Sequence, residues 1–158
     1  MKKMLLLSLM TALSIASFSA TTQVTAQLNV IDPASEVSLN LSSTSAAFGD
    51  VLIANGEVSL ANPITFTLEG TAAKNAILSV PTTIELANGS NKITLATEVT
   101  GTGFDKTTDG ANTILTSTET MDQTAGTLEG TLSAKLNLLG TEIPGRYNGT
   151  IALNASYN

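Results

Sequence analysis

The chain of 158 residues contains no cysteine, no histidine and no tryptophan, and only four phenylalanines and two tyrosines. Without cysteine there is no disulfide, no thiol nucleophile and no lipid anchor on cysteine. Without histidine a Ser-His-Asp triad is impossible, and the commonest zinc ligand is missing. The scarcity of aromatic rings argues against a glycosidase cleft built around two carboxylates. We therefore expect no enzymatic activity, no catalytic residue, no metal and no cofactor.

Basic residues are also scarce, and two of the seven lie at the start of the chain. Lys2 and Lys3 precede an apolar run that extends to Phe18. Ser17 and Ser19 then place small side chains at positions −3 and −1 of a cleavage site, as is typical of a secretory signal peptide. The sequence thus predicts a signal peptide over residues 1–19 and export through the Sec pathway to the periplasm.

The mature chain, taken from Ala20 onward, has five basic and 13 acidic residues, a net charge of −8. Nucleic acids and anionic membranes are bound by clustered lysine and arginine. The basic residues of the mature chain are scattered instead, so we expect no nucleic-acid partner.

Short runs of alternating apolar residues fill the mature chain, as is typical of strands with one buried face. They are Val24–Val30, Val37–Leu41, Glu57–Leu60, Ile64–Leu68, Ala76–Val80, Thr82–Leu86, Lys92–Val99, Asn112–Thr116, Leu128–Leu138 and Tyr147–Tyr157. Turn signals such as Phe48-Gly49-Asp50 separate them. The pattern predicts an all-β sandwich. We expect polar loops over Gly101–Gly110 and Ser117–Gly126, and helix only as a single turn near Thr71–Asn75.

The last fourteen residues carry the most informative pattern. Apolar residues or glycine occupy every second position from Tyr147 to the penultimate residue of the chain. The full set of positions is Gly145, Tyr147, Gly149, Ile151, Leu153, Ala155, Tyr157 and the terminal Asn158. Since chain ends usually fray unless something holds them, an apolar face kept intact to the end predicts a strand used for pairing.

This ending resembles the C-terminal motif of chaperone–usher pilins. The stretch Ile143-Pro144-Gly145-Arg146-Tyr147-Asn148-Gly149 is similar to the P-x-G-x-Y-x-G start of their last strand, and Leu128–Leu132 is similar to their penultimate strand. Many pilins carry one disulfide, so the absence of cysteine points to the cysteine-free branches, of the colonisation-factor type or of fimbrial-like secreted domains.

The resemblance implies an incomplete immunoglobulin-like β-sandwich over residues 33–158, whose last strand borders an open groove. It also implies a structural subunit of a surface fimbria, which polymerises by donor-strand exchange and mediates adhesion. The implied partners are identical or related pilin subunits, a periplasmic chaperone, an outer-membrane usher and possibly a host receptor. Ile151, Leu153 and Ala155 should line the groove, with Tyr157 closing it and the Asn158 carboxylate held by the chaperone.

The first mature strand resembles the donor strand of such a subunit. Val24, Ala26, Leu28 and Val30 form one apolar face, and Pro33 ends the strand because proline has no N–H to donate. We expect residues 20–32 to form an arm that inserts into the next subunit. Four inserted side chains would contribute roughly 5–10 kcal/mol of apolar burial.

From periodicity alone, the run Val24–Val30 is equally well explained as the first strand of the domain's own core. The alternative function is then a free-standing secreted β-sandwich that binds carbohydrate or protein. The two functions differ in whether Val24–Val30 packs in its own domain or projects away from it. The acidic stretch Asp105–Gly110 lacks the alternating ligands of a calcium loop and is expected to be an ordinary turn.

Overall fold

The computed structural model describes residues 21–31, 37–70, 74–121 and 127–158. Within these ranges the chain forms twelve strands and no helix, so the all-β prediction is confirmed. The predicted signal peptide, Pro33 and most of the expected turn at Thr71–Asn75 lie outside the described residues. Lys74, at the end of that stretch, forms an isolated β-bridge with Met121.

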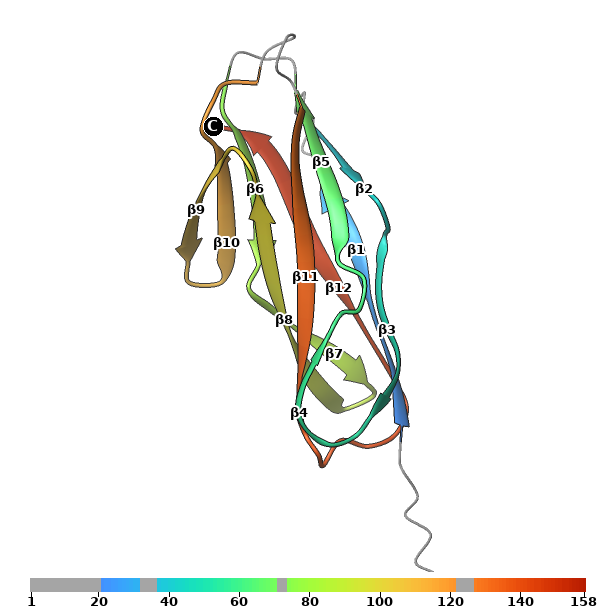
Figure 1. The fold of residues 1–158 in the computed structure, drawn as a ribbon. Helices are drawn as coiled ribbons and strands as arrows, with labels where there is room; N and C mark the ends of the chain where they lie inside the picture. The colour runs from blue at the N-terminus through green and yellow to red at the C-terminus, as the bar shows by residue number, and fades with distance from the viewer. Residues whose placement is uncertain (1–20, 32–36, 71–73, 122–126) are drawn as a thin grey trace, which may run out of the picture.

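The strands are β1 (Thr21–Ile31), β2 (Val37–Leu41), β3 (Ser45–Leu52), β4 (Asn55–Ser59), β5 (Ile64–Gly70), β6 (Ala76–Pro81), β7 (Thr83–Asn88), β8 (Asn91–Gly101), β9 (Phe104–Asp109), β10 (Asn112–Ser117), β11 (Thr127–Leu139) and β12 (Arg146–Tyr157). Hydrogen bonds join them in the order β2-β5-β11-β8-β7-β12-β6-β10-β9. Two strands branch from this path: β4 pairs with β11, and β1 pairs with β12 and β3 (Figure 1). Every pairing is antiparallel except that of β1 with β12.

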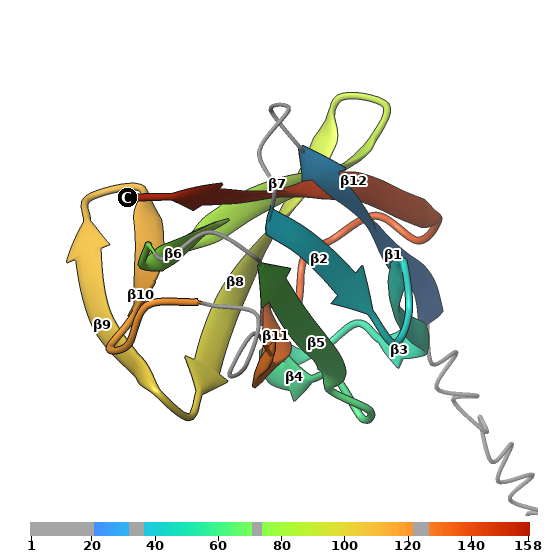
Figure 2. The same ribbon diagram turned by 90° about the horizontal axis from the view of Figure 1, so that it is seen from above.

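The sheet folds over on itself where β7 meets β12. These two strands share a single register pair, Asn148 with Ala87, whereas β8 and β11 share eight. Seen from above, β12 lies across the molecule from β5 and β11 (Figure 2). The strands therefore form two layers, with β2, β5, β4, β11, β8 and β7 in one and β3, β1, β12, β6, β10 and β9 in the other.

The core lies between these layers and is filled by the inward positions of alternating strands. Its largest fully buried side chains come from both layers: Leu68, Leu86, Leu95, Leu136, Leu78, Leu115, Tyr147, Ile151 and Leu153. Each side chain of this size contributes roughly 1.5–3 kcal/mol when it leaves water. Alternation with polar outward residues is clearest in β5 and β12, where buried and more exposed positions follow one another over much of the strand.

Two sequence expectations about turns and loops are wrong. Phe48-Gly49-Asp50 is no turn but the middle of β3. The pairing register with β1 shifts there, because Val24 faces Gly49 while Thr25 faces Ala47. Gly49 has a positive φ of 71°, so this turn-like signal is a β-bulge that bends a continuing strand.

The expected polar loop Gly101–Gly110 contains β9, which pairs with β10 over its whole length. Nearly every residue of β9 is exposed, so the strand has no apolar alternation to reveal it. Its hairpin closes at Gly110, whose φ is 61°, and Asp109 accepts a hydrogen bond from the Asn112 N–H at 3.2 Å. The Asp105–Gly110 stretch is thus a strand followed by a tight turn.

Candidate functional site

β1 fills the space between β3 and β12, the two strands that would otherwise face each other across an open edge (Figure 1). It runs antiparallel to β3 over Thr21–Gln27 and parallel to β12 over Gln23–Ile31. In this position β1 lies within its own domain and does not project from it. We refer to the space that β1 occupies, bounded by β3 and β12, as the β1 channel.

The register brings the two sequence-predicted apolar sets together. Val24, Ala26, Leu28 and Val30 of β1 are the Cα partners of Tyr147, Gly149, Ile151 and Leu153 of β12, in that order. Because side chains alternate between faces, partners in register share a face of the sheet. Ala26 and Leu28 therefore form a double row with Gly149 and Ile151 on the core side of the β1 channel, and the backbone register continues to Tyr147 and Leu153.

The central pair of β1 residues is fully packed. Ala26 has no exposed surface, and Leu28 is 7% exposed. On the β3 side Ala26 faces Ala46, which is also buried, and the Leu28 N–H donates to the Thr44 carbonyl at 2.9 Å. Gln27, between the two, is exposed. β3 is thus the second wall of the channel, which the sequence reading missed because Gly49 interrupts its alternation.

The start of β12 is fixed by close contacts. The Tyr147 hydroxyl donates to the Ile143 carbonyl at 3.0 Å, and Tyr147 is 1% exposed. At Gly145, a Cβ atom would collide with the side-chain amide of Asn88. At Gly149, a Cβ atom would lie 2.5 Å from Leu86 Cδ2. Both glycines therefore allow β12 to pass close to β7.

The end of β12 lies beyond the β1 channel. β1 reaches only as far as Asn154, after which Ala155 and Tyr157 pair with Leu78 and Ala76 of β6. Ala155 is buried, Tyr157 is partly buried, and its ring lies against Gly70. The Asn158 N–H donates to the Asn75 carbonyl at 2.8 Å. The structure therefore places Ala155, Tyr157 and Asn158 apart from the row that contacts β1.

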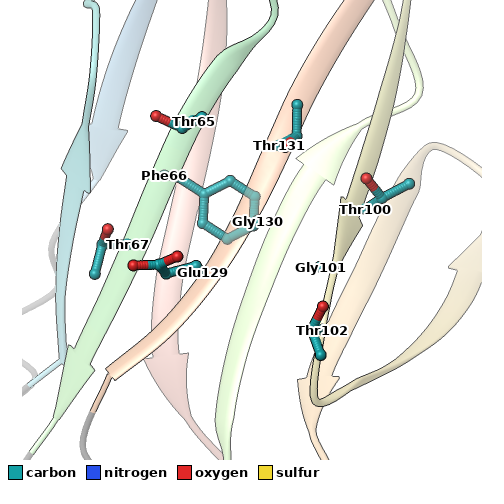
Figure 3. A pocket seen from close by; sticks show the side chains of 9 residues that line it. All are labelled: Thr65, Phe66, Thr67, Thr100, Gly101, Thr102, Glu129, Gly130 and Thr131. Carbon is teal, nitrogen blue, oxygen red and sulfur yellow. The ribbon is translucent and has the colours of Figure 1, made fainter.

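A shallow hollow of about 510 Å³ lies over β5, β8 and β11 (Figure 3). Thr65, Thr67, Thr100, Thr102 and Thr131 line it together with the Glu129 carboxylate. The Phe66 ring lies against Gly130, where a Cβ atom would overlap it, and 6.3 Å from the ring of Phe104. The hollow offers hydroxyl groups and a single carboxylate, without a paired acid and base.

Charged chemistry is sparse over the described ranges, where no group of three or more metal-ligating side chains comes together. Glu142 is the titratable residue with a clear pKa shift among them. Burial raises the pKa of this carboxyl. Hydrogen bonds from the backbone N–H groups of residues 139–142 outweigh this effect and lower the pKa below its usual value. No helix in this part of the chain has the length and apolarity needed to cross a membrane.

Comparison with known proteins gives little. No family model matches the sequence, and no curated protein matches it. Among solved structures, a non-cellulosomal cohesin from the hyperthermophilic archaeon Archaeoglobus fulgidus shows a weak likeness. It has 10% sequence identity and a TM-score of 0.27 over 88% of this chain and 92% of that chain. A likeness at this level supports no argument about function.

Proposed function

We propose that this protein is a structural subunit of a surface fimbria, whose subunits join by exchanging β1. In the fibre, β1 of one subunit occupies the β1 channel of the next, completing an immunoglobulin-like sandwich. The observation that carries the proposal is that β1 is a central strand, paired with β3 on one side and β12 on the other. In its register with β12, an apolar residue of β1 is the partner of each apolar residue or glycine at alternate positions from Tyr147 to Leu153. Among the described residues β1 is the first strand, so it can leave without unthreading any other described strand.

Removal of β1 would leave a site specific for one kind of ligand. β12 would lose its pairing with β1 over Arg146–Asn154, and β3 would lose the one strand that it pairs with among the described residues. Such an open apolar edge is a template for a further strand. Backbone hydrogen bonds then provide affinity, and the pockets vacated by alternate side chains provide specificity. The ligand that fits is an extended segment with the spacing of β1 itself.

The direction of insertion decides what is assembled. Only the five residues 32–36 separate β1 from β2, so a subunit that lends its β1 stays within about 20 Å of the acceptor. If the inserted β1 runs parallel to β12, as it does within one chain, the same end of each subunit faces the other. Two subunits can then exchange their β1 strands and form a closed dimer. Antiparallel insertion places opposite ends together and gives an open filament. Reversal makes the ladder with β12 antiparallel and the ladder with β3 parallel, so strand pairing alone does not decide between the two directions. The period-2 apolar face of β1 is kept on reversal, and the proposed fibre requires the antiparallel direction.

The same channel explains the further partners. Before assembly, a periplasmic chaperone covers the open edge, and an outer-membrane usher delivers the subunit to the cell surface. The mature protein is then extracellular, in a fimbria that mediates adhesion, with a host receptor as a possible ligand. The chaperone covers the edge of β12 that pairs with β1 over Arg146–Asn154.

The second candidate function is a free-standing secreted β-sandwich that binds carbohydrate or protein. One observation favours it: β1 is packed in its own domain, with Ala26 fully buried. A single experiment separates the two functions, because the chain has no cysteine of its own. Ala26 and Ala46 are cross-strand partners on antiparallel strands, where Cα atoms lie within the range that a disulfide spans.

The test compares the mature protein carrying Ala26→Cys and Ala46→Cys in its oxidised and reduced forms. Oxidation should lock β1 to β3 and hold the protein as a monomer in size-exclusion chromatography. Reduction should release a ladder of polymers, as in the unmodified protein. The Ala46→Cys variant alone is the control, and should polymerise under both conditions. A clean monomer for the unmodified protein at all concentrations would instead support the free-standing sandwich.

A further inference from the structure

The hollow over β5, β8 and β11, which we call the threonine hollow, lies on the outer face of the sandwich (Figure 3). On β5, the exposed Thr65 and the partly exposed Thr67 alternate with the buried Ile64, Phe66 and Leu68, so both threonines point away from the core. The hollow belongs to the layer of β5, β11 and β8, whereas the β1 channel lies in the other layer. An exchanged β1 would therefore leave the threonine hollow open.

The polar side chains of the threonine hollow stand in two rows across the strands. Thr65, Thr131 and Thr100 are cross-strand partners in the first row. Thr67 and Glu129 are partners in the second row, and Thr102 also lines the hollow just after the end of β8. Because neighbouring strands lie about 4.8 Å apart, a row over three strands presents its groups across roughly 10 Å.

The floor between the rows is supported from the core side. It consists of the backbone of Phe66, Gly130 and Gly101, which are cross-strand partners of one another. The Phe66 ring lies against Gly130 and the Phe104 ring lies against Gly101, in the places that Cβ atoms would take. Phe66 is 3% exposed, so its ring packs beneath the floor and does not enter the hollow. A site that is shaped before binding loses less conformational freedom when a ligand arrives.

The hydroxyl groups of the threonine hollow are available to a ligand. Elsewhere threonine hydroxyls bond to the protein itself, since Thr82 donates to the Ala111 carbonyl at 3.0 Å and Thr118 donates to the Gly103 carbonyl at 3.2 Å. Within the described residues, none of the five threonine hydroxyls of the hollow donates such a bond. Threonine is branched at Cβ and has few rotamers, so these hydroxyls lose little freedom when they bind.

The charge of the threonine hollow comes from one exposed carboxylate, that of Glu129. No lysine or arginine lines the hollow. In the described part of the chain the ion pairs are Lys92 with Glu85 and Lys135 with Glu57, so the Glu129 carboxylate is not neutralised by either. A ligand that carries negative charge is therefore repelled.

A second hollow of about 480 Å³ adjoins the first and shares Thr102 and Glu129 with it. It adds the Glu119 carboxylate and the side chain of Leu128, and no basic residue lines it either. The two hollows together form a groove that is long enough for a ligand of several units. Since β5 and β11 are paired on both sides, the groove offers no free strand edge to an extended peptide.

We propose that this groove binds a neutral oligosaccharide. Sugar hydroxyls both donate to and accept from threonine hydroxyls, and the Glu129 carboxylate accepts from them in stronger, charge-assisted bonds. The role of this binding in adhesion rests on the proposed function, whereas the binding itself requires no strand exchange. The groove is shallow, so one contact is weak, and a fibre that presents one groove per subunit binds through many contacts at once.

The test measures binding to a single subunit and locates it. The probes are short neutral oligomers of glucose, mannose, galactose and N-acetylglucosamine, each with a sulfated form for comparison. They are titrated into the oxidised protein carrying Ala26→Cys and Ala46→Cys, which should stay monomeric, and into the unmodified protein alongside. Backbone amide shifts in nuclear magnetic resonance spectra report both the dissociation constant and the strands that are contacted.

The variants remove hydroxyl groups and keep the shape of the side chain. Thr65→Val combined with Thr131→Val alters the first row, and valine suits a strand at both positions. Thr94→Val is the matched control, because Thr94 is an exposed threonine of β8 that lies outside the groove.

At least one neutral oligomer should shift the amides of β5, β8 and β11 around the groove. The paired valine variant should bind it roughly tenfold more weakly, since two net hydrogen bonds are lost, and Thr94→Val should bind as the unmodified protein does. The sulfated form should bind more weakly than its neutral counterpart. The proposal is overturned if no neutral oligomer binds, if the shifts lie elsewhere, if the paired variant binds normally, or if sulfation strengthens binding.

Size-exclusion chromatography of the unmodified protein tests strand exchange separately. An unmodified protein that binds the oligomer and stays monomeric would leave the groove standing and remove strand exchange. One that assembles normally and binds no neutral oligomer would remove the groove and leave strand exchange standing.

Discussion

At Gly149 the last strand passes so close to β7 that a Cβ atom would lie 2.5 Å from Leu86 Cδ2 and 3.0 Å from the Glu85 carbonyl. Gly149 is also the register partner of Ala26, the smallest apolar residue of β1. Small residues thus meet on both strands at the middle of the β1 channel. Since Ala26 is fully buried and a Cβ on Gly149 would collide with Leu86, this position should be sensitive to added volume.

Gly149→Val should destabilise the protein by about 1–3 kcal/mol, because Leu86 and the β7 backbone must shift to admit the side chain. Ala152→Val is the control, since Ala152 lies on the exposed face of the same strand and a branched residue suits a strand there. Urea unfolding followed by circular dichroism measures both. Equal midpoints for the two variants would show that β12 and β7 can separate without cost.

Ala26→Phe should also destabilise the protein, because it adds volume on β1 itself, at the register partner of Gly149. Ala26 has no exposed surface, and its β3 partner Ala46 is 1% exposed, so no space remains for a ring. The expected cost is again about 1–3 kcal/mol, and the variant should fail to exchange its strand. Gln27→Phe, on the exposed side of β1, serves as the control in urea unfolding and in assembly. Assembly of Ala26→Phe at the normal rate would contradict a tightly fitted channel.

Among the elements, the turn between β11 and β12 depends on one carboxylate. Backbone N–H groups from Leu139 to Glu142 surround the Glu142 carboxyl, and together they lower its pKa despite the opposing effect of burial. A lowered pKa means that the charged form is bound more tightly in the folded state. The resulting stability is present above the ordinary pKa of the carboxyl and is lost as the pH falls through the lowered value.

Glu142→Gln should therefore destabilise the protein at pH 7, and the difference from the unmodified protein should shrink once the pH falls below the lowered pKa. Denaturant midpoints at pH 7 and pH 3 measure this difference. Amide exchange at Leu139 and Gly140 localises it, because these N–H groups lose their acceptor. Glu129→Gln is the control, since it removes a carboxylate at the other end of β11, away from this turn. A difference that is constant with pH would argue against the carboxylate as the cause.

Sequence pattern was sufficient for elements with regular alternation and failed for the others. β5 and β12 were predicted within about two residues of their bounds because their apolar or glycine positions alternate without a break. β3 was missed because its bulge at Gly49 resembles a turn, and β9 because almost all its side chains face water. Neither β3 nor β9 can be recognised from the hydrophobicity of its residues alone, since both strands are defined by their backbone pairing.

For the candidate site, periodicity identified the faces but not their partners. The apolar rows of β1 and β12 follow from alternation, whereas their parallel pairing and the place of Ala46 on the opposite wall do not. Pairing between the two ends of the chain depends on the whole topology, because a strand's side-chain pattern is the same in either direction. The exposure of Leu52, Leu139 and Ile143 was missed for a related reason, since these residues end strands or lie between them, where alternation stops.

At the scale of the whole molecule, the free edges of the sandwich differ in how they are protected. β9 is exposed and carries Asp105, Lys106 and Asp109, which discourage pairing with another chain. β2 and β4 are short strands of five residues each. The edge that β1 covers on β12 is longer, apolar and regular. The proposed assembly can therefore use the edge of β12, while β9, β2 and β4 are protected against pairing with other chains.

A chain beginning at residue 33 should expose this edge and depend on an added strand for its stability. Without β1 it should aggregate or unfold at low temperature, since β3 and the start of β12 lose their partner. A peptide spanning Thr21–Asp32 should raise its melting temperature as the peptide concentration rises, by ordinary binding linkage. A peptide in which Ala26 and Leu28 are replaced by aspartate is the control and should give no rise, because its charges cannot enter the core. If the shortened chain stays unfolded at every concentration of the natural peptide, β1 belongs to the folding core of its own domain, and the free-standing sandwich is the better account of this protein.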